Sequence, residues 1–142
     1  IKKKKLTKTA SVKYDTDGVA IEFTDRMVFS PGSAQTSPYF KTVSHKVLDL
    51  IAKSSKDYRI TIEGHTDDTP LGRSSRYKNN WELSSARGVS MVELFKREGV
   101  KQEKMRVIAY ADTKPKLQIR GKKGKDLKLA RSKNRRIVVR ID

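Results

Sequence analysis

The side chains in this chain that are best suited to chemistry are a carboxylate and a guanidinium on either side of a polar loop. Asp67 follows the alternating, β-branched segment 59–63, which predicts a strand, and polar groups at a strand's end are often displayed for binding. Arg87 lies on an expected helix, next to its apolar stripe. Across a cleft this pair suits a zwitterion, because Asp67 would take an ammonium and Arg87 would hold a carboxylate through two hydrogen bonds.

Each of these residues also has a purely structural explanation. Asp67 would satisfy backbone donors in its own turn, and Asp68 is expected to stabilise that turn. Arg87 borders an apolar face, so once buried it needs an anionic partner, and an ion pair with Asp67 would supply one. Asn80 is expected to cap the helix, and a place in the pocket wall is the alternative.

Hydrophobic periodicity and turn signals predict the elements that position these residues. The expected strands are 11–14 and 19–23, joined by an Asp-Gly turn, then 59–63, 105–110 and 136–141. The expected helices are 38–54, capped by Thr36 or Ser37 and packed through Phe40, Val43, Val47, Leu50 and Ile51, then 80–98 and 127–133. Two strand–helix–strand units on one mixed sheet predict an α+β sandwich with its helices on one face.

Composition sets limits on the class of protein. A chain of 142 residues is long enough for one domain with a real core. It has no cysteine, so neither disulfides nor thiolate chemistry is expected. No apolar run approaches the roughly 20 residues of a membrane helix. Because the chain begins at Ile1, we expect a fragment or processed product, and any signal or membrane anchor would lie upstream.

The net charge of +17 favours polyanionic partners. The basic residues concentrate in segments 2–5 and 122–136, so nucleic-acid binding is one hypothesis. Against it, residues 116–142 contain no aromatic side chain on which bases would stack. We expect most of this charge to form a solvated face, a generic attraction to anionic wall material to come next, and specific nucleic-acid recognition to come last.

Three ordered motifs carry a resemblance to a known family. They are EGHTD at 63–67, NWELSSAR at 80–87 and RSKNRR at 131–136. Together they resemble the OmpA-like peptidoglycan-binding domain over roughly 27–141, and the second motif and the long loop before it resemble the MotB branch, the stator subunit of the flagellar motor. The chain departs from the pattern at Ala111, where glycine is usual, and in its basic 116–128 loop.

The resemblance implies a function and a set of site residues. It implies non-covalent peptidoglycan binding that anchors a stator, with a diamino acid of the peptide stem as the recognised group. The implied ligand-binding residues are Thr66, Asp67, Asn80, Leu83, Arg87 and Arg135. Another wall anchor of this family, such as a peptidoglycan-associated lipoprotein or the tail of an outer-membrane protein, is the alternative.

The resemblance also implies an organisation and a location. Residues 1–26 would be a basic linker with a β-hairpin, and 27–142 the binding domain. The protein would be the periplasmic part of a bacterial inner-membrane protein, a homodimer, and bound to a MotA-type partner through an N-terminal region outside this chain.

The chain offers little for catalysis. His65 precedes Asp67 by two residues, but His45 is the one other histidine, so no zinc site or general base is predicted. No nucleophile elbow or phosphate-binding loop occurs. We therefore predict binding without catalysis, and no metal or cofactor.

Overall fold

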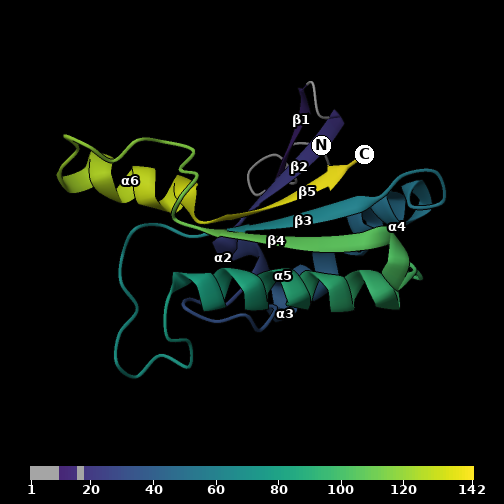
Figure 1. Cartoon of the computed structure of the whole chain (residues 1–142), viewed down its shortest axis with the longest axis horizontal. Coiled ribbons are helices and arrows are strands. Elements are labelled where there is room, and N and C mark those ends of the chain that lie inside the picture. Colours follow the sequence, from purple (N-terminus) through teal and green to yellow (C-terminus); the bar gives the residue numbers. More distant parts are fainter. Residues whose placement is uncertain (1–9, 16–17) are drawn as a thin grey trace.

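The chain folds around one five-stranded mixed sheet with helices along one face (Figure 1). This computed structural model describes residues 10–15 and 18–142. The strands are β1 (Ala10–Asp15), β2 (Gly18–Thr24), β3 (Ile60–His65), β4 (Met105–Ala111) and β5 (Arg136–Ile141). The helices are α2 (Asp25–Val28), α3 (Pro38–Val43), α4 (His45–Ser54), α5 (Asn80–Arg97), a 3₁₀ turn (Gln102–Lys104) and α6 (Gly124–Asn134).

The strands lie in the order β1-β2-β5-β3-β4. The β3–β4 pair is parallel, as the long crossover through α5 requires, and the other pairs are antiparallel. The predicted α+β fold with a mixed sheet and helices on one face is confirmed. In Figure 1, α6 lies beyond the end of the sheet.

The N-terminal strand pair belongs to the same sheet as the rest of the chain. β2 pairs with both β1 and β5, and Phe23 is fully buried in the main core. Residues 1–9 and the predicted turn residues Thr16 and Asp17 lie outside the described part of the chain. That residues 1–26 serve as a linker to the domain at 27–142 stays a prediction.

The first predicted helix is divided into α3 and α4 at Ser44. Ser37 caps α3 by accepting from the Phe40 amide at 3.1 Å, and Pro38 follows at the first helical position, as predicted. The predicted core stripe is wrong at Leu50, which is 65% exposed, while Leu48 is buried. The reason is that a polar residue, Ser44, lies on the buried stripe, and its hydroxyl hydrogen-bonds back to the helix, which bends helices.

Helix α5 approaches the sheet closely because two glycines lie at the contact. A Cβ on Gly64 of β3 would collide with the carbonyl oxygen of Ser84, and a Cβ on Gly88 of α5 would collide with Val107 of β4. This close packing fixes the height of α5 above the carboxyl end of β3. No helix in the described part of the chain is long and apolar enough to cross a bilayer.

Candidate ligand-binding site

A cavity of about 290 Å³ opens at the carboxyl end of β3. Its walls come from the loop after β3, the start of α5, α2 with the loop that follows it, and Arg135 at the end of α6. The structure brings all six predicted site residues into the lining of this one cavity: Thr66, Asp67, Asn80, Leu83, Arg87 and Arg135. Their contact with a ligand stays a prediction.

Asp67 is held by its own turn and by an arginine. Its Oδ1 accepts from the backbone amide of Thr69 at 2.8 Å, which is the local turn contact expected of aspartate. Its Oδ2 accepts from Nη1 of Arg135 at 2.7 Å. The carboxylate is 10% exposed and lines the cavity, so it combines a structural contact with access to a ligand.

Arg87 pairs with Asp25, so the predicted pairing with Asp67 is wrong. Nη1 of Arg87 lies 3.4 Å from Oδ2 of Asp25, and Nε donates to the carbonyl of Ser33 at 2.9 Å. The guanidinium also lies 4.8 Å from the centroid of the Phe29 ring, at cation–π distance. Burial lowers the pKa of Arg87 and the charge of Asp25 opposes that shift; a guanidinium keeps its proton in proteins.

Asp25 is the site residue that the sequence reasoning missed. It opens α2 directly after β2 and is 7% exposed. The available signal is an acidic residue between Phe23 and Met27, two residues of the apolar core. A carboxylate in such a segment requires a cationic partner, and α5 supplies that partner 62 residues further along the chain.

The pocket charges form an alternating row. Oδ2 of Asp25 lies 3.4 Å from Nε of Arg135 as well as 3.4 Å from Nη1 of Arg87. Arg135 in turn contacts Asp67. The row therefore runs Arg87, Asp25, Arg135, Asp67, with an arginine at one end and a carboxylate at the other. It is neutral overall, and a zwitterion adds to it without leaving a buried net charge.

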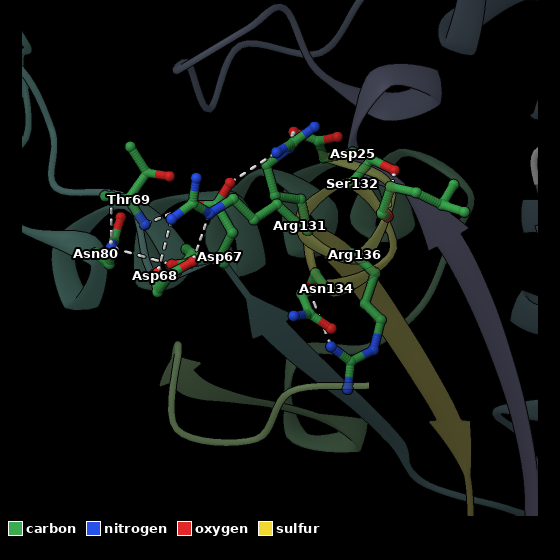
Figure 2. Close-up of polar contacts among 12 residues, drawn as sticks. Asp25, Asp67, Asp68, Thr69, Asn80, Arg131, Ser132, Asn134 and Arg136 are labelled. Atoms are coloured by element: carbon green, nitrogen blue, oxygen red, sulfur yellow. Dashed lines mark hydrogen bonds and ion pairs between the residues drawn. The ribbon is translucent and has the colours of Figure 1, made fainter. Parts of the chain in front are cut away.

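Asn80 belongs to the pocket wall, and the prediction that it caps the helix is wrong. Asn79 is the cap, because its side chain accepts from the Glu82 amide at 3.0 Å. Nδ2 of Asn80 donates to the carbonyls of Asp67 at 3.3 Å and Thr69 at 3.1 Å (Figure 2). The start of α5 therefore fixes the loop that carries Asp67.

Thr66 and Leu83 complete this side of the pocket. The Thr66 hydroxyl donates to the carbonyl of Asp67 at 2.9 Å, and Leu83 is 4% exposed. The Thr66 amide donates to the carbonyl of Ala111 at 2.8 Å. Ala111 has a φ of +53°, so the backbone keeps the left-handed conformation for which glycine is usual.

Asp68 pairs with α6, a contact that the sequence analysis did not predict. Its two oxygens accept from Nε and Nη2 of Arg131 at 2.9 and 3.1 Å (Figure 2). This two-point hydrogen bond lowers the pKa of Asp68. Asp68 does not line the cavity. The pair attaches α6 to the loop at the rim of the pocket.

His65 lies outside this pocket. Its Nε2 is 3.0 Å from Oε1 of Glu63, and its ring stacks on Tyr110 with centroids 5.0 Å apart. Oε2 of Glu63 accepts from Nε of Arg140 at 2.6 Å. Within residues 10–15 and 18–142, no group of three or more histidine, cysteine or acidic side chains is placed to hold a metal ion.

A family model and the geometry agree on the class of protein. The OmpA family model matches residues 28–136, which are most of the chain and contain the whole pocket except Asp25 and Arg26. The chain belongs to the OmpA family.

Two curated relatives share sequence with this chain. The protein YtxE of Bacillus subtilis is 32% identical over 116 residues, which cover 81% of this chain and 47% of YtxE. Motility protein B of Escherichia coli K12 is 32% identical over 74 residues, covering 50% of this chain and 23% of that protein. The chain thus spans less than half the length of each of these relatives.

Solved structures share the fold. A MotB-like protein of Desulfovibrio vulgaris superposes with a TM-score of 0.84 at 21% identity, covering 96% of this chain and 83% of that one. The cell wall anchor of the type VI secretion system of Pseudomonas aeruginosa gives 0.81 at 20% identity, covering 98% and 91%. The resemblance to MotB periplasmic domains is therefore a finding at the level of fold.

Proposed function

We propose that this OmpA-family domain binds peptidoglycan non-covalently through the Asp67–Arg87 pocket and so anchors a larger protein to the cell wall. The observation that carries the proposal is the alternating charge row inside a 290 Å³ cavity. Its two ends are complementary to the two charges of an amino acid. The family and the name of the Pseudomonas neighbour, a cell wall anchor, support the same function.

Recognition proceeds by exchange of ionic partners. The ammonium of a peptide-stem diamino acid takes a place on Asp67 beside or instead of Arg135, and the carboxylate takes a place on the Arg87 guanidinium beside or instead of Asp25. Leu83 and Thr66 shape the wall, and Asn80 holds the loop in position. Because both protein charges are already oriented by fixed partners, little conformational order has to be gained on binding.

The protein that carries this domain is proposed to be a stator subunit of the MotB type. Motility protein B relatives and the MotB-like structural neighbour support this assignment. The domain would lie in the periplasm, form a homodimer, and reach a MotA-type partner through a region outside this chain. Two weak wall contacts in a dimer would act together through effective concentration. Another wall anchor of the same family is the alternative.

The proposed role is binding without catalysis, because holding a stator requires a lasting contact and no turnover. No histidine lines the cavity, and the carboxylates of Asp25 and Asp67 are occupied in ion pairs with arginines.

The test is co-sedimentation with purified insoluble peptidoglycan at moderate salt. Asp67→Asn and Asp68→Asn remove the same charge from adjacent residues, but only Asp67 lines the cavity. We expect the Asp67→Asn variant to lose most of its binding, and Arg87→Lys to lose it as well, while Asp68→Asn binds like the wild type. Equal binding by all variants would show that the net positive charge alone retains the protein on the wall.

A further inference from the structure

The loop after β4 and α6 form a strongly basic projection, which we call the cationic arm (residues 114–133). In Figure 1 it extends past the end of the sheet, at the opposite end of the molecule from α4. Residues 114–136 contain eleven basic residues and one acidic residue, Asp126, whereas the whole chain has 33 basic and 16 acidic residues. Within residues 10–15 and 18–142, the net positive charge is therefore concentrated at one end of the molecule.

Some of these basic residues have structural partners. Lys116 pairs with Glu22 at 2.7 Å, Arg131 pairs with Asp68, and Arg135 pairs with Asp67. The remaining side chains of the arm pair with no carboxylate of residues 10–15 and 18–142: Lys114, Arg120, Lys122, Lys123, Lys125, Lys128 and Lys133. All of them except the half-buried Lys122 are exposed.

Fold stability does not account for these lysines. Lys122, Lys123 and Lys125 lie around the first turn of α6, where the helix dipole is already positive and a further cation is unfavourable. The opposite end of the molecule shows the favourable arrangement, because Lys53 and Lys96 lie in the last turns of α4 and α5, where a cation complements the helix dipole. The arm thus retains electrostatic repulsion that an anionic partner would relieve.

We propose that the cationic arm binds a linear anionic polymer that carries phosphate groups along its backbone and no bases. Lysine is a point-charge phosphate ligand, which suits a flexible chain of regularly spaced anions. No aromatic residue follows Tyr110, so the arm has no platform for stacking bases. Leu129 is exposed but Ala130 is buried, so α6 presents no continuous apolar stripe to a membrane.

The arm lies next to the proposed peptidoglycan pocket. The Arg131–Asp68 pair attaches α6 to the loop that carries Asp67. A polymer along the arm would therefore run beside the stem peptide, and the two contacts would reinforce each other through effective concentration. The inference that this polymer belongs to the cell wall rests on the proposed function. The inference that the arm binds polyphosphate does not depend on the proposed function.

The test compares two variants that each lose four positive charges. In the arm variant, Lys122, Lys123, Lys125 and Lys128 are changed to Gln. In the control variant, Lys53, Lys56, Lys101 and Lys104 are changed to Gln around a second cavity, which is lined by the end of α4 and the segment that follows α5. Binding of fluorescently labelled long-chain inorganic polyphosphate is measured by anisotropy over a series of salt concentrations. Circular dichroism and urea unfolding of both variants check that the fold is retained.

We expect the arm variant to bind polyphosphate at least about tenfold more weakly, and its slope of log K against log salt to fall by roughly 3, the value for the loss of four phosphate contacts. The control variant should bind within about threefold of the wild type, because its lysines lie outside the arm. Equal losses in the two variants would overturn the proposal in favour of net charge alone. An unaffected arm variant would overturn it as well.

Two further ligands and one further variant distinguish the partner classes. Stronger binding to single-stranded DNA of matched charge, or to anionic lipid vesicles, than to polyphosphate would overturn the proposal in favour of that partner. Asp67→Asn should bind polyphosphate like the wild type, and the arm variant should still bind a soluble muropeptide. These two results distinguish a failure of the proposed polyphosphate binding by the arm from a failure of the proposed peptidoglycan binding by the pocket.

Discussion

Arg135 donates to Asp67 at 2.7 Å and so connects the residue that follows α6 with the loop that follows β3. The same guanidinium lies 3.4 Å from Asp25, which also pairs with Arg87. Four elements of the fold thus meet through charged side chains, and each charge in the row compensates a neighbour. The stability of the pocket and its capacity to take a zwitterion therefore depend on the same ion pairs.

Asp25→Ala should lower the free energy of unfolding by about 3 kcal/mol, because it leaves the Arg87 guanidinium buried without a carboxylate. The side chains of this pair are 9% and 3% exposed. Asp68→Ala is the matched control, since the Asp68–Arg131 pair is about a third exposed and should cost less than about 1 kcal/mol. Urea unfolding measures both, and similar losses in the two variants would contradict this ranking.

Acid should destabilise the protein through His65. Burial lowers the pKa of this imidazole below 6.5, although its hydrogen bond to Glu63 opposes the shift. The neutral ring donates from Nε2 to Glu63, and Nδ1 is buried with no partner among the described residues, so a second proton on the ring would have no acceptor there. The unfolded chain then binds more protons, and stability falls as the pH drops below about 6.5.

Glu63 adds a second acid-labile contribution at lower pH. Burial raises the pKa of its carboxyl, but hydrogen bonds from His65 and Arg140 outweigh burial and place the pKa below 4.5. The stabilisation from the ionised Glu63 carboxylate is present above pH 4.5. It is lost as the pH falls through the pKa of Glu63 in the folded state, which lies below 4.5. In urea unfolding between pH 7 and 5, His65→Gln should flatten the pH dependence and His45→Gln should not; no difference between these variants would exclude His65 as the source.

Ala111→Gly should stabilise the fold by up to about 1 kcal/mol, because Ala111 has a φ of +53°, where a side chain is strained and glycine is not. Ala109→Gly is the matched change in the same strand at an ordinary φ, and it should destabilise by about 1 kcal/mol. Thermal unfolding measures both. A loss of stability in both variants would mean that the Ala111 methyl contributes more through packing than it costs in backbone strain.

Gly64→Ala should destabilise the fold by about 1–3 kcal/mol, because its Cβ would collide with the backbone of Ser84 and push α5 away from the sheet. Gly72→Ala lies in open space and should be close to neutral. Chemical unfolding compares the two, and an unaffected Gly64→Ala variant would contradict the close approach of α5.

The motifs and the hydrophobic periodicity predicted most of the fold, because individual strands and helices are encoded by local sequence patterns. The strand before Asp67, the helix that carries Arg87 and the last strand all form where alternation or capping residues placed them. The mistakes occur where a polar residue takes a core position. Ser44 lies on the buried stripe of α3 and α4 and moves the contact from Leu50 to Leu48, and no hydrophobic pattern encodes that choice.

The sequence predicted which residues line the candidate site, but it did not predict which of them form ion pairs with each other. All six residues line one cavity, but the partner of Arg87 is Asp25, which is 62 residues earlier in the chain. Long-range ion pairs depend on how α2, α5 and the end of α6 are arranged in space, and the spacing of residues along the sequence does not predict that arrangement. The signal that was available, an acidic residue in an apolar segment, indicates burial but does not identify the partner.

The most direct test of the central claim is an NMR titration of the isotopically labelled protein with a soluble muropeptide whose stem carries a diamino acid. We predict chemical-shift changes centred on the amides of Thr66, Asp67, Asn80 and Arg135. These changes should be lost when the free stem amine is acetylated, and lost in the Asp67→Asn variant. Unchanged binding after acetylation, or shifts that map to α4 instead of the pocket, would contradict recognition of a zwitterion by Asp67 and Arg87.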